Sequence, residues 1–130
     1  EDALKRPQRA EAAFRDAVAA SRKLLKPNPG PALEFAMFLT RQSRQGEAQK
    51  LLDEILKFAP DFGPAHLERA KYLFAQGDPE SALAEAKIAL DQAGSDPKSL
   101  RAAHAFLART CFALGRMEEA QVHQSWIESH

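Results

Sequence analysis

The chain has 130 residues, rich in alanine and leucine and poor in valine and isoleucine, and this bias favours helix over strand. Its 18 basic side chains balance its 18 acidic ones, so no net charge attracts nucleic acid or an anionic membrane. No apolar run approaches the roughly 20 residues that a membrane-spanning helix needs. A single cysteine, Cys111, excludes an internal disulfide and a multi-cysteine metal site. The compartment stays unknown, and a bacterial cytoplasm and a bacterial periplasm both fit.

The first predicted element is an amphipathic helix over residues 8–26, which is ended by the prolines at 27 and 29. Small and apolar side chains fall along one of its faces: Ala10, Phe14, Ala17, Val18, Ser21 and Leu25. The polar start over residues 1–6, with Pro7 after it, predicts little order before this helix.

Three segments after this helix share one skeleton of small residues. In two of them an alanine precedes a glycine by seven positions and another follows it by five; these are Ala70, Gly77 and Ala82, then Ala108, Gly115 and Ala120. The earliest segment has Ala36 and Ala48, each 34 residues before its counterpart. The next step is 38 residues, because four residues are inserted around 95–99. A period of about 34 residues is typical of helix–turn–helix repeats.

This skeleton resembles the tetratricopeptide repeat family, with repeats at 29–62, 63–96 and 101–130. The resemblance implies an all-α fold, a right-handed superhelix of antiparallel helix pairs (an α-solenoid) with about seven helices. It also implies one domain over residues 1–130, in which the alanines let each helix A approach its helix B. Larger side chains are expected to seal each pair: Phe35, Leu39, Leu52, Ile55, Leu73, Leu107 and Ile127.

Several residues mark where the repeats begin, turn and end. Pro60 and Gly94 are expected to end the B helices. Asp96 reads as an N-cap before a proline, so helix A of the third repeat is expected to begin about a turn early. Ser43 replaces the turn glycine of the first repeat. Polar Gln124 and Glu128 stand where earlier repeats have apolar packing residues, a change expected at the end of an array; these earlier residues are Leu52, Leu56, Ala86 and Leu90.

In this family the A helices line a groove that holds a partner. Carried over by repeat position, the groove residues here are Leu33, Met37, Leu67, Lys71, Phe74, Phe106, Arg109 and Phe112. Apolar side chains with a few charges suit a peptide or an amphipathic helix with apolar anchors, and Lys71 and Arg109 suit an acidic group. The alternative is that the three phenylalanines pack against neighbouring helices.

Some members of the family clamp a chaperone's terminal carboxylate with cationic and amide side chains. The corresponding positions here hold Leu33, Met37, Glu68, Ala102 and Phe106. A carboxylate would meet apolar surface and another carboxylate at these positions, so recognition by that mechanism is not expected.

The sequence contains no motif of a known catalytic or phosphate-binding type, and we predict a protein that is not an enzyme and has no cofactor. His66 and His104 occupy equivalent positions, where core histidines are favoured over metal ligands. Cys111 is expected to be a small buried hydrophobe. Trp126 is expected either to cap the seam between the last two helices or to form an exposed contact surface.

The favoured function is therefore a protein–protein interaction scaffold whose concave groove binds a peptide or helical segment of a partner. One alternative is a secretion-type chaperone that shields an apolar client segment. Another is an accessory domain of a larger enzyme or membrane-assembly protein, which a chain starting at Glu1 and an unpaired first helix favour. The expected partners are proteins or peptides, with no nucleic acid and no membrane insertion, and self-association through the C-terminal helix is a further alternative.

Overall fold

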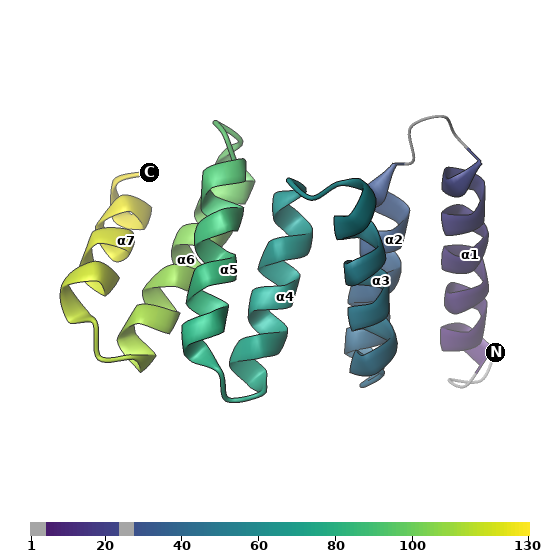
Figure 1. Ribbon diagram of the computed structural model, residues 1–130, viewed down its shortest axis with the longest axis horizontal. Helices are drawn as coiled ribbons and strands as arrows, with labels where there is room; N and C mark the ends of the chain where they lie inside the picture. Colours follow the sequence, from purple (N-terminus) through teal and green to yellow (C-terminus); the bar gives the residue numbers. More distant parts are fainter. Residues whose placement is uncertain (1–4, 24–27) are drawn as a thin grey trace. The chain divides into compact units, whose positions relative to one another are not determined.

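The computed structural model describes residues 5–23 and 28–130, which contain seven α-helices and no strand (Figure 1). The helices pack mainly on their neighbours in the chain, so the all-α class and the consecutive pairing are confirmed. The chain divides into two compact units, Glu1–Pro60 and Asp61–His130. The single domain over residues 1–130 and the handedness of the superhelix stay predictions.

Unit 1, Glu1–Pro60, contains α1 (Lys5–Arg22), α2 (Pro29–Arg41) and α3 (Gln45–Phe58). The predicted limits of the first helix, 8–26, are wrong, since α1 begins at Lys5 and ends at Arg22. Pro7 lies inside its first turn, where a backbone N–H has no intrahelical acceptor and a proline is tolerated. Leu25, predicted on the packing face, lies outside the described residues, and Ala17 of the same predicted face is exposed.

An aromatic contact and an ion pair attach α1 to the rest of unit 1. Phe14 stacks on Phe35 at a centroid distance of 6.1 Å and contacts Phe38 at 5.2 Å. The guanidinium of Arg44, at the start of α3, donates to both carboxylate oxygens of Glu11 on α1, with Nη2–Oε2 at 3.0 Å. This guanidinium, together with that of Arg15, lowers the pKa of Glu11 to about 2.

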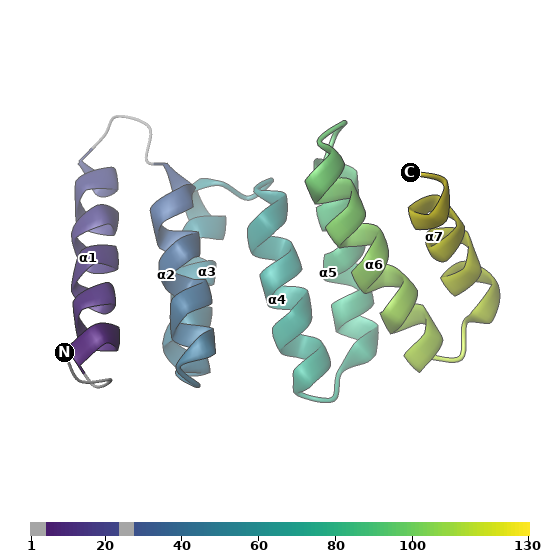
Figure 2. The same cartoon turned by 180° about the vertical axis from the view of Figure 1, so that it is seen from behind.

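Unit 2, Asp61–His130, contains α4 (Gly63–Ala75), α5 (Pro79–Gln92), α6 (Pro97–Ala113) and α7 (Met117–Ser129). Helices α4 and α5 form one hairpin and α6 and α7 a second, while α6 also packs on α4 and α5 (Figures 1 and 2). The predicted early start of α6 is confirmed, because the Asp96 carboxylate accepts from the Ser99 amide at 3.1 Å and caps the helix. Gly94 ends α5 with φ +60°.

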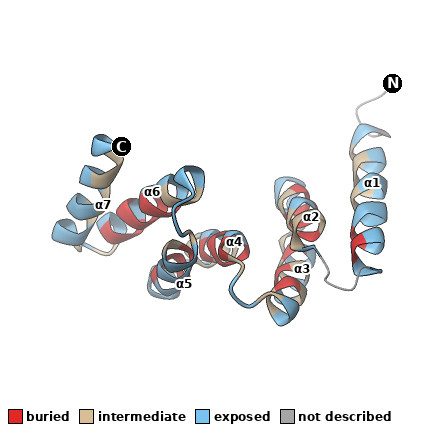
Figure 3. Cartoon of the chain, turned by 90° about the horizontal axis from the view of Figure 1, so that it is seen from above, coloured by how far each residue is buried: buried red, intermediate tan, exposed pale blue. Residues whose placement is uncertain are grey.

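Small residues lie at the helix contacts, as the repeat predicted. Ala48, Ala70 and Ala82 are fully buried, and Ala36 is 2% exposed. An alanine leaves room for two helix backbones to approach, and larger neighbours then exclude water around the contact. Figure 3 shows the buried residues concentrated where paired helices face one another. The last helix differs, since α7 contains no buried residue.

None of the helices in the described part of the chain combines the length and apolar character that a membrane-spanning segment needs.

Candidate partner-binding face

Six of the eight predicted groove residues lie in unit 2, on the two A helices α4 and α6. These are Leu67, Lys71 and Phe74 on α4, and Phe106, Arg109 and Phe112 on α6. The other two, Leu33 and Met37, are half-buried on α2 of unit 1.

Aromatic and cationic side chains of α4 and α6 meet directly. The Phe74 ring packs edge-on against Phe106 with centroids 6.0 Å apart. The Arg109 guanidinium carbon lies 4.8 Å from the centroid of the Phe74 ring, a cation–π contact that contributes about 0.5–1 kcal/mol at an exposed site. Phe74 therefore joins the two helices while part of its ring stays accessible.

The side chains of this set differ in exposure. Phe106 is 6% exposed and Leu67 9%, and both belong to the core of unit 2. Phe112, by contrast, is 67% exposed. Lys71 is exposed and forms an ion pair with Glu68 at 3.2 Å, a contact that water screens. The residues available to a partner are thus Lys71, Phe74, Arg109 and Phe112, which we call the α4–α6 face.

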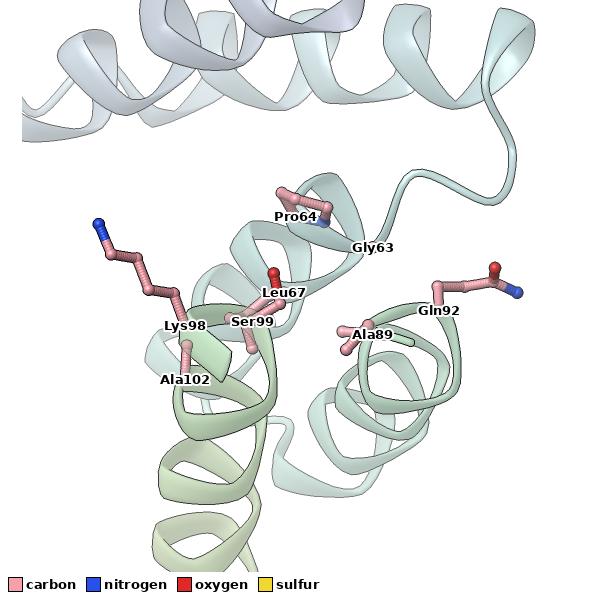
Figure 4. Close-up of a pocket in the computed structure, with 9 residues that line it drawn as sticks. Gly63, Pro64, Leu67, Ala89, Gln92, Lys98, Ser99 and Ala102 are labelled. Atoms are coloured by element: carbon pink, nitrogen blue, oxygen red, sulfur yellow. The ribbon is translucent and has the colours of Figure 1, made fainter. Parts of the chain in front are cut away.

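One hollow of unit 2 borders this face, and another lies at the ends of its helices. One, of about 470 Å³, lies between α6 and α7 and is lined by Arg109 and Phe112 together with Ala105, Ala108, Met117, Ala120, Gln121 and Gln124. The other is a pocket of about 230 Å³ at the adjoining ends of α4, α5 and α6, lined by Gly63, Pro64, Leu67, Ala89, Gln92, Ala93, Lys98, Ser99 and Ala102. In Figure 4 the long side chains of Lys98 and Gln92 extend outward from this pocket. Most of its wall is apolar.

The pocket depends on a close approach of two helices. A Cβ added at Gly63 would meet the Ala89 carbonyl oxygen at 3.3 Å and the Gln92 Cβ at 3.4 Å, so the glycine lets the start of α4 lie against the end of α5. Of the residues that line this pocket, the family resemblance placed only Leu67 and Ala102 at groove positions. The signal that was missed is the glycine at the first position of α4, followed by small residues at the facing ends of α5 and α6.

The two histidines singled out by their repeat position are both buried, at 8% exposed for His66 and 9% for His104. Each contacts the residue 19 positions later: His66 Nδ1 lies 2.7 Å from the Glu85 carboxylate, and His104 Nδ1 lies 2.9 Å from His123 Nδ1. Within residues 5–23 and 28–130, no group of three or more potential metal ligands converges.

Cys111 and Trp126 lie on the two helices of the last hairpin, α6 and α7. Cys111 is fully buried, as expected, and burial raises the pKa of its thiol. Trp126 is half-buried and stacks on His104 of α6 with centroids 4.3 Å apart. Of its two predicted placements, the indole therefore adopts the cap over the seam between α6 and α7.

No protein-family model matches the chain, and no curated protein sequence matches it either.

Proposed function

We propose that this protein holds a peptide or helical segment of another protein against the α4–α6 face. The observation that carries the proposal is the arrangement of Phe74, Arg109 and Phe112, which the family resemblance assigned to a groove and which lie around one exposed surface of unit 2. Exposed aromatic and arginine side chains are the residue types enriched at protein interfaces. The resemblance of the repeat skeleton to the tetratricopeptide family supports the same function.

The chemistry of the face suggests the kind of segment that it holds. The pocket of about 230 Å³ is suited to an apolar anchor side chain, because its walls are largely alanine, leucine and proline. Lys71 and Arg109 add positive charge beside the aromatic rings. A segment with one or two apolar anchors and a nearby carboxylate is therefore the expected ligand.

The test uses a displayed library of random peptides selected on the full chain. Phe112→Glu places a charge on the face and is expected to abolish binding of the selected peptides. Ala102→Phe, which fills the pocket from α6, is expected to weaken it at least tenfold, the loss that about 1.4 kcal/mol causes. Both positions are exposed, so the variants are expected to fold normally.

Two control variants carry the same changes elsewhere. Val122→Glu alters a residue of α7 that is 66% exposed, as Phe112 is 67% exposed, but lines neither hollow. Ala84→Phe adds an aromatic ring at an exposed position of α5. Binding should survive both. The proposal fails if no peptide is selected, or if folded Phe112→Glu and Ala102→Phe bind as tightly as the two controls do.

A further inference from the structure

Four aromatic side chains form one cluster where α7 meets α6. His104 of α6 and His123 of α7 face each other, with their Nδ1 atoms 2.9 Å apart. Trp126 stacks on His104, and its other contact is His130, whose ring lies 4.2 Å away at an interplanar angle of 9°. The His130 Nδ1 also lies 2.8 Å from the Trp126 carbonyl oxygen. The rings of His123, Trp126 and His130 thus connect α7 and the residue after it to His104 of α6.

The hydrogen bond between His104 and His123 limits how many protons the two imidazole rings can carry. At 2.9 Å one Nδ1 donates an N–H and the other accepts it with a lone pair. An imidazolium has a proton on both nitrogens, so only one ring of the pair can be charged while the hydrogen bond persists. If both rings were charged, two N–H groups and two positive charges would face each other at this distance.

Helix α7 is less deeply buried than α3 and α5, which close the two earlier hairpins. The helix contains no buried residue, whereas α5 buries four residues and α3 buries three. Its closest side chains, Ala120, His123, Trp126 and Ile127, are all only half-buried. Two of these four belong to the aromatic cluster. Loss of the histidine contact therefore removes one of the less exposed contacts between α7 and α6.

The preceding hairpin provides an internal comparison. His66 and Glu85, at the positions equivalent to His104 and His123, form the same contact between α4 and α5 at 2.7 Å. A protonated His66 faces a carboxylate and gains an ion pair. A protonated His104 faces a second imidazole. Equivalent positions thus hold a histidine–carboxylate contact in one hairpin and a histidine–histidine contact in the other.

Three neighbouring side chains of unit 2 affect the protonation of the His104–His123 pair. Lys87 on α5 disfavours a proton on His123, and Glu119, one turn earlier on α7, favours it, while His130 disfavours a charge on His104. Burial is the largest effect on both rings and lowers the pKa of each below its usual value. The Trp126 face favours a charged His104, but this stack accommodates one charge and does not relieve the conflict of two.

We propose that His104 and His123 form a proton-sensitive clasp that holds α7 on α6 at neutral pH and releases it under mildly acidic conditions. Above the ordinary histidine pKa of about 6.5 both rings are neutral whether α7 is attached or released, so pH has no effect. Below it the released rings take up two protons, whereas the clasped pair holds at most one. Because the clasp excludes one proton, the ratio of released to clasped molecules rises by up to tenfold for each unit by which the pH falls.

The chain contains one tryptophan and one cysteine, and both report on this contact. Cys111 is fully buried on α6 in the core of unit 2, and its Sγ lies 3.8 Å from a Glu119 carboxylate oxygen of α7. Release of α7 uncovers this side of the thiol and is expected to raise its rate of labelling. The experiment measures labelling of Cys111 by dithiodipyridine from about pH 7.5 to about pH 5. The labelling rate of the urea-unfolded chain, divided by that of the folded chain at the same pH, gives a protection factor. Trp126 fluorescence is recorded in parallel.

The expected result is constant protection above about pH 7 and a fall of up to tenfold per pH unit below about pH 6.5. Trp126 emission should move to longer wavelength over the same range. His123→Glu copies the neighbouring His–Glu contact and should abolish the fall, while His123→Gln removes one of the two titrating rings and should lessen it. The control His66→Gln should behave as the unmodified chain does.

Three results would overturn the proposal. One is constant protection of the unmodified chain across the whole range. A second is an equal fall in either His123 variant, provided that circular dichroism shows it folded at neutral pH. The third needs no variant: proton NMR titration of the imidazole rings in the unmodified chain shows His104 and His123 both becoming charged while Cys111 remains protected.

Discussion

Replacing Ser43 with glycine is expected to stabilise unit 1. Ser43 follows the end of α2 with φ +61°, while Gly77 and Gly115, at the equivalent positions after α4 and α6, have φ +83° and +76°. The hydrogen bonds of the three turns also correspond: the next residue's amide, that of Arg44 in the first turn, donates to the Leu39 carbonyl at 2.8 Å. This left-handed turn closes a helix and is usually made with glycine.

The size of the effect follows from two opposing terms. A side chain in the left-handed region costs about 1–2 kcal/mol, which glycine removes. Glycine also has more freedom in the unfolded chain, which costs about 0.5–1 kcal/mol. The net gain for Ser43→Gly is therefore about 0.5–1 kcal/mol. For a unit of this size the gain raises Tm by about 2–8 °C.

The reverse substitution, Gly77→Ser, is the matched control in unit 2. A Cβ at Gly77 would meet nothing within 4 Å, so its cost is conformational and is expected to be about 0.5–1 kcal/mol. Both variants are measured by urea unfolding, followed by far-ultraviolet circular dichroism. A Ser43→Gly variant that is less stable than the unmodified chain, or a Gly77→Ser variant with unchanged stability, would refute the reasoning.

Two further predictions concern the core of unit 2 and the attachment of α1. Leu107→Ala removes a fully buried side chain and should cost about 2–5 kcal/mol in urea unfolding, while Val122→Ala, at an exposed position, should change stability by less than about 0.5 kcal/mol. The pKa of Glu11 is about 2, below its ordinary value of 4.5, because Arg44 and Arg15 donate hydrogen bonds to its carboxylate. The ionised carboxylate therefore stabilises the fold above pH 4.5. This contribution to stability is lost as the pH falls toward 2. The Tm difference between the unmodified chain and Glu11→Gln should shrink over that range, and a difference that stays constant would contradict the assignment.

The helices and their pairing could be predicted because their signals are local. Asp96 followed by proline marked the start of α6, and Gly94 the end of α5, since capping depends on a few neighbouring residues. The spacing of Ala70 and Ala82 predicted a close helix contact, and both are fully buried. A period repeated along the chain carries this information because each helix pair packs by the same geometry.

The ends of α1 were predicted less well. Pro7 was read as a boundary, yet a proline in the first turn of a helix breaks no hydrogen bond, so the sequence is compatible with a start on either side of it. The contacts that hold α1, from Phe14 to Phe35 and Phe38, join residues far apart in the chain. Local periodicity contains no information on such pairs.

For the candidate site too, some features follow from the sequence and others depend on tertiary packing. The family resemblance placed Phe106 and Phe112 in one groove, but only the packing of α4 and α5 against α6 decides that Phe106 is 6% exposed and Phe112 67%. The pocket beside Gly63 likewise forms only where the ends of three helices meet. Composition, period and helix ends follow from residues near one another in sequence, whereas exposure, pockets and the contact between His104 and His123 depend on which helix faces cover each other.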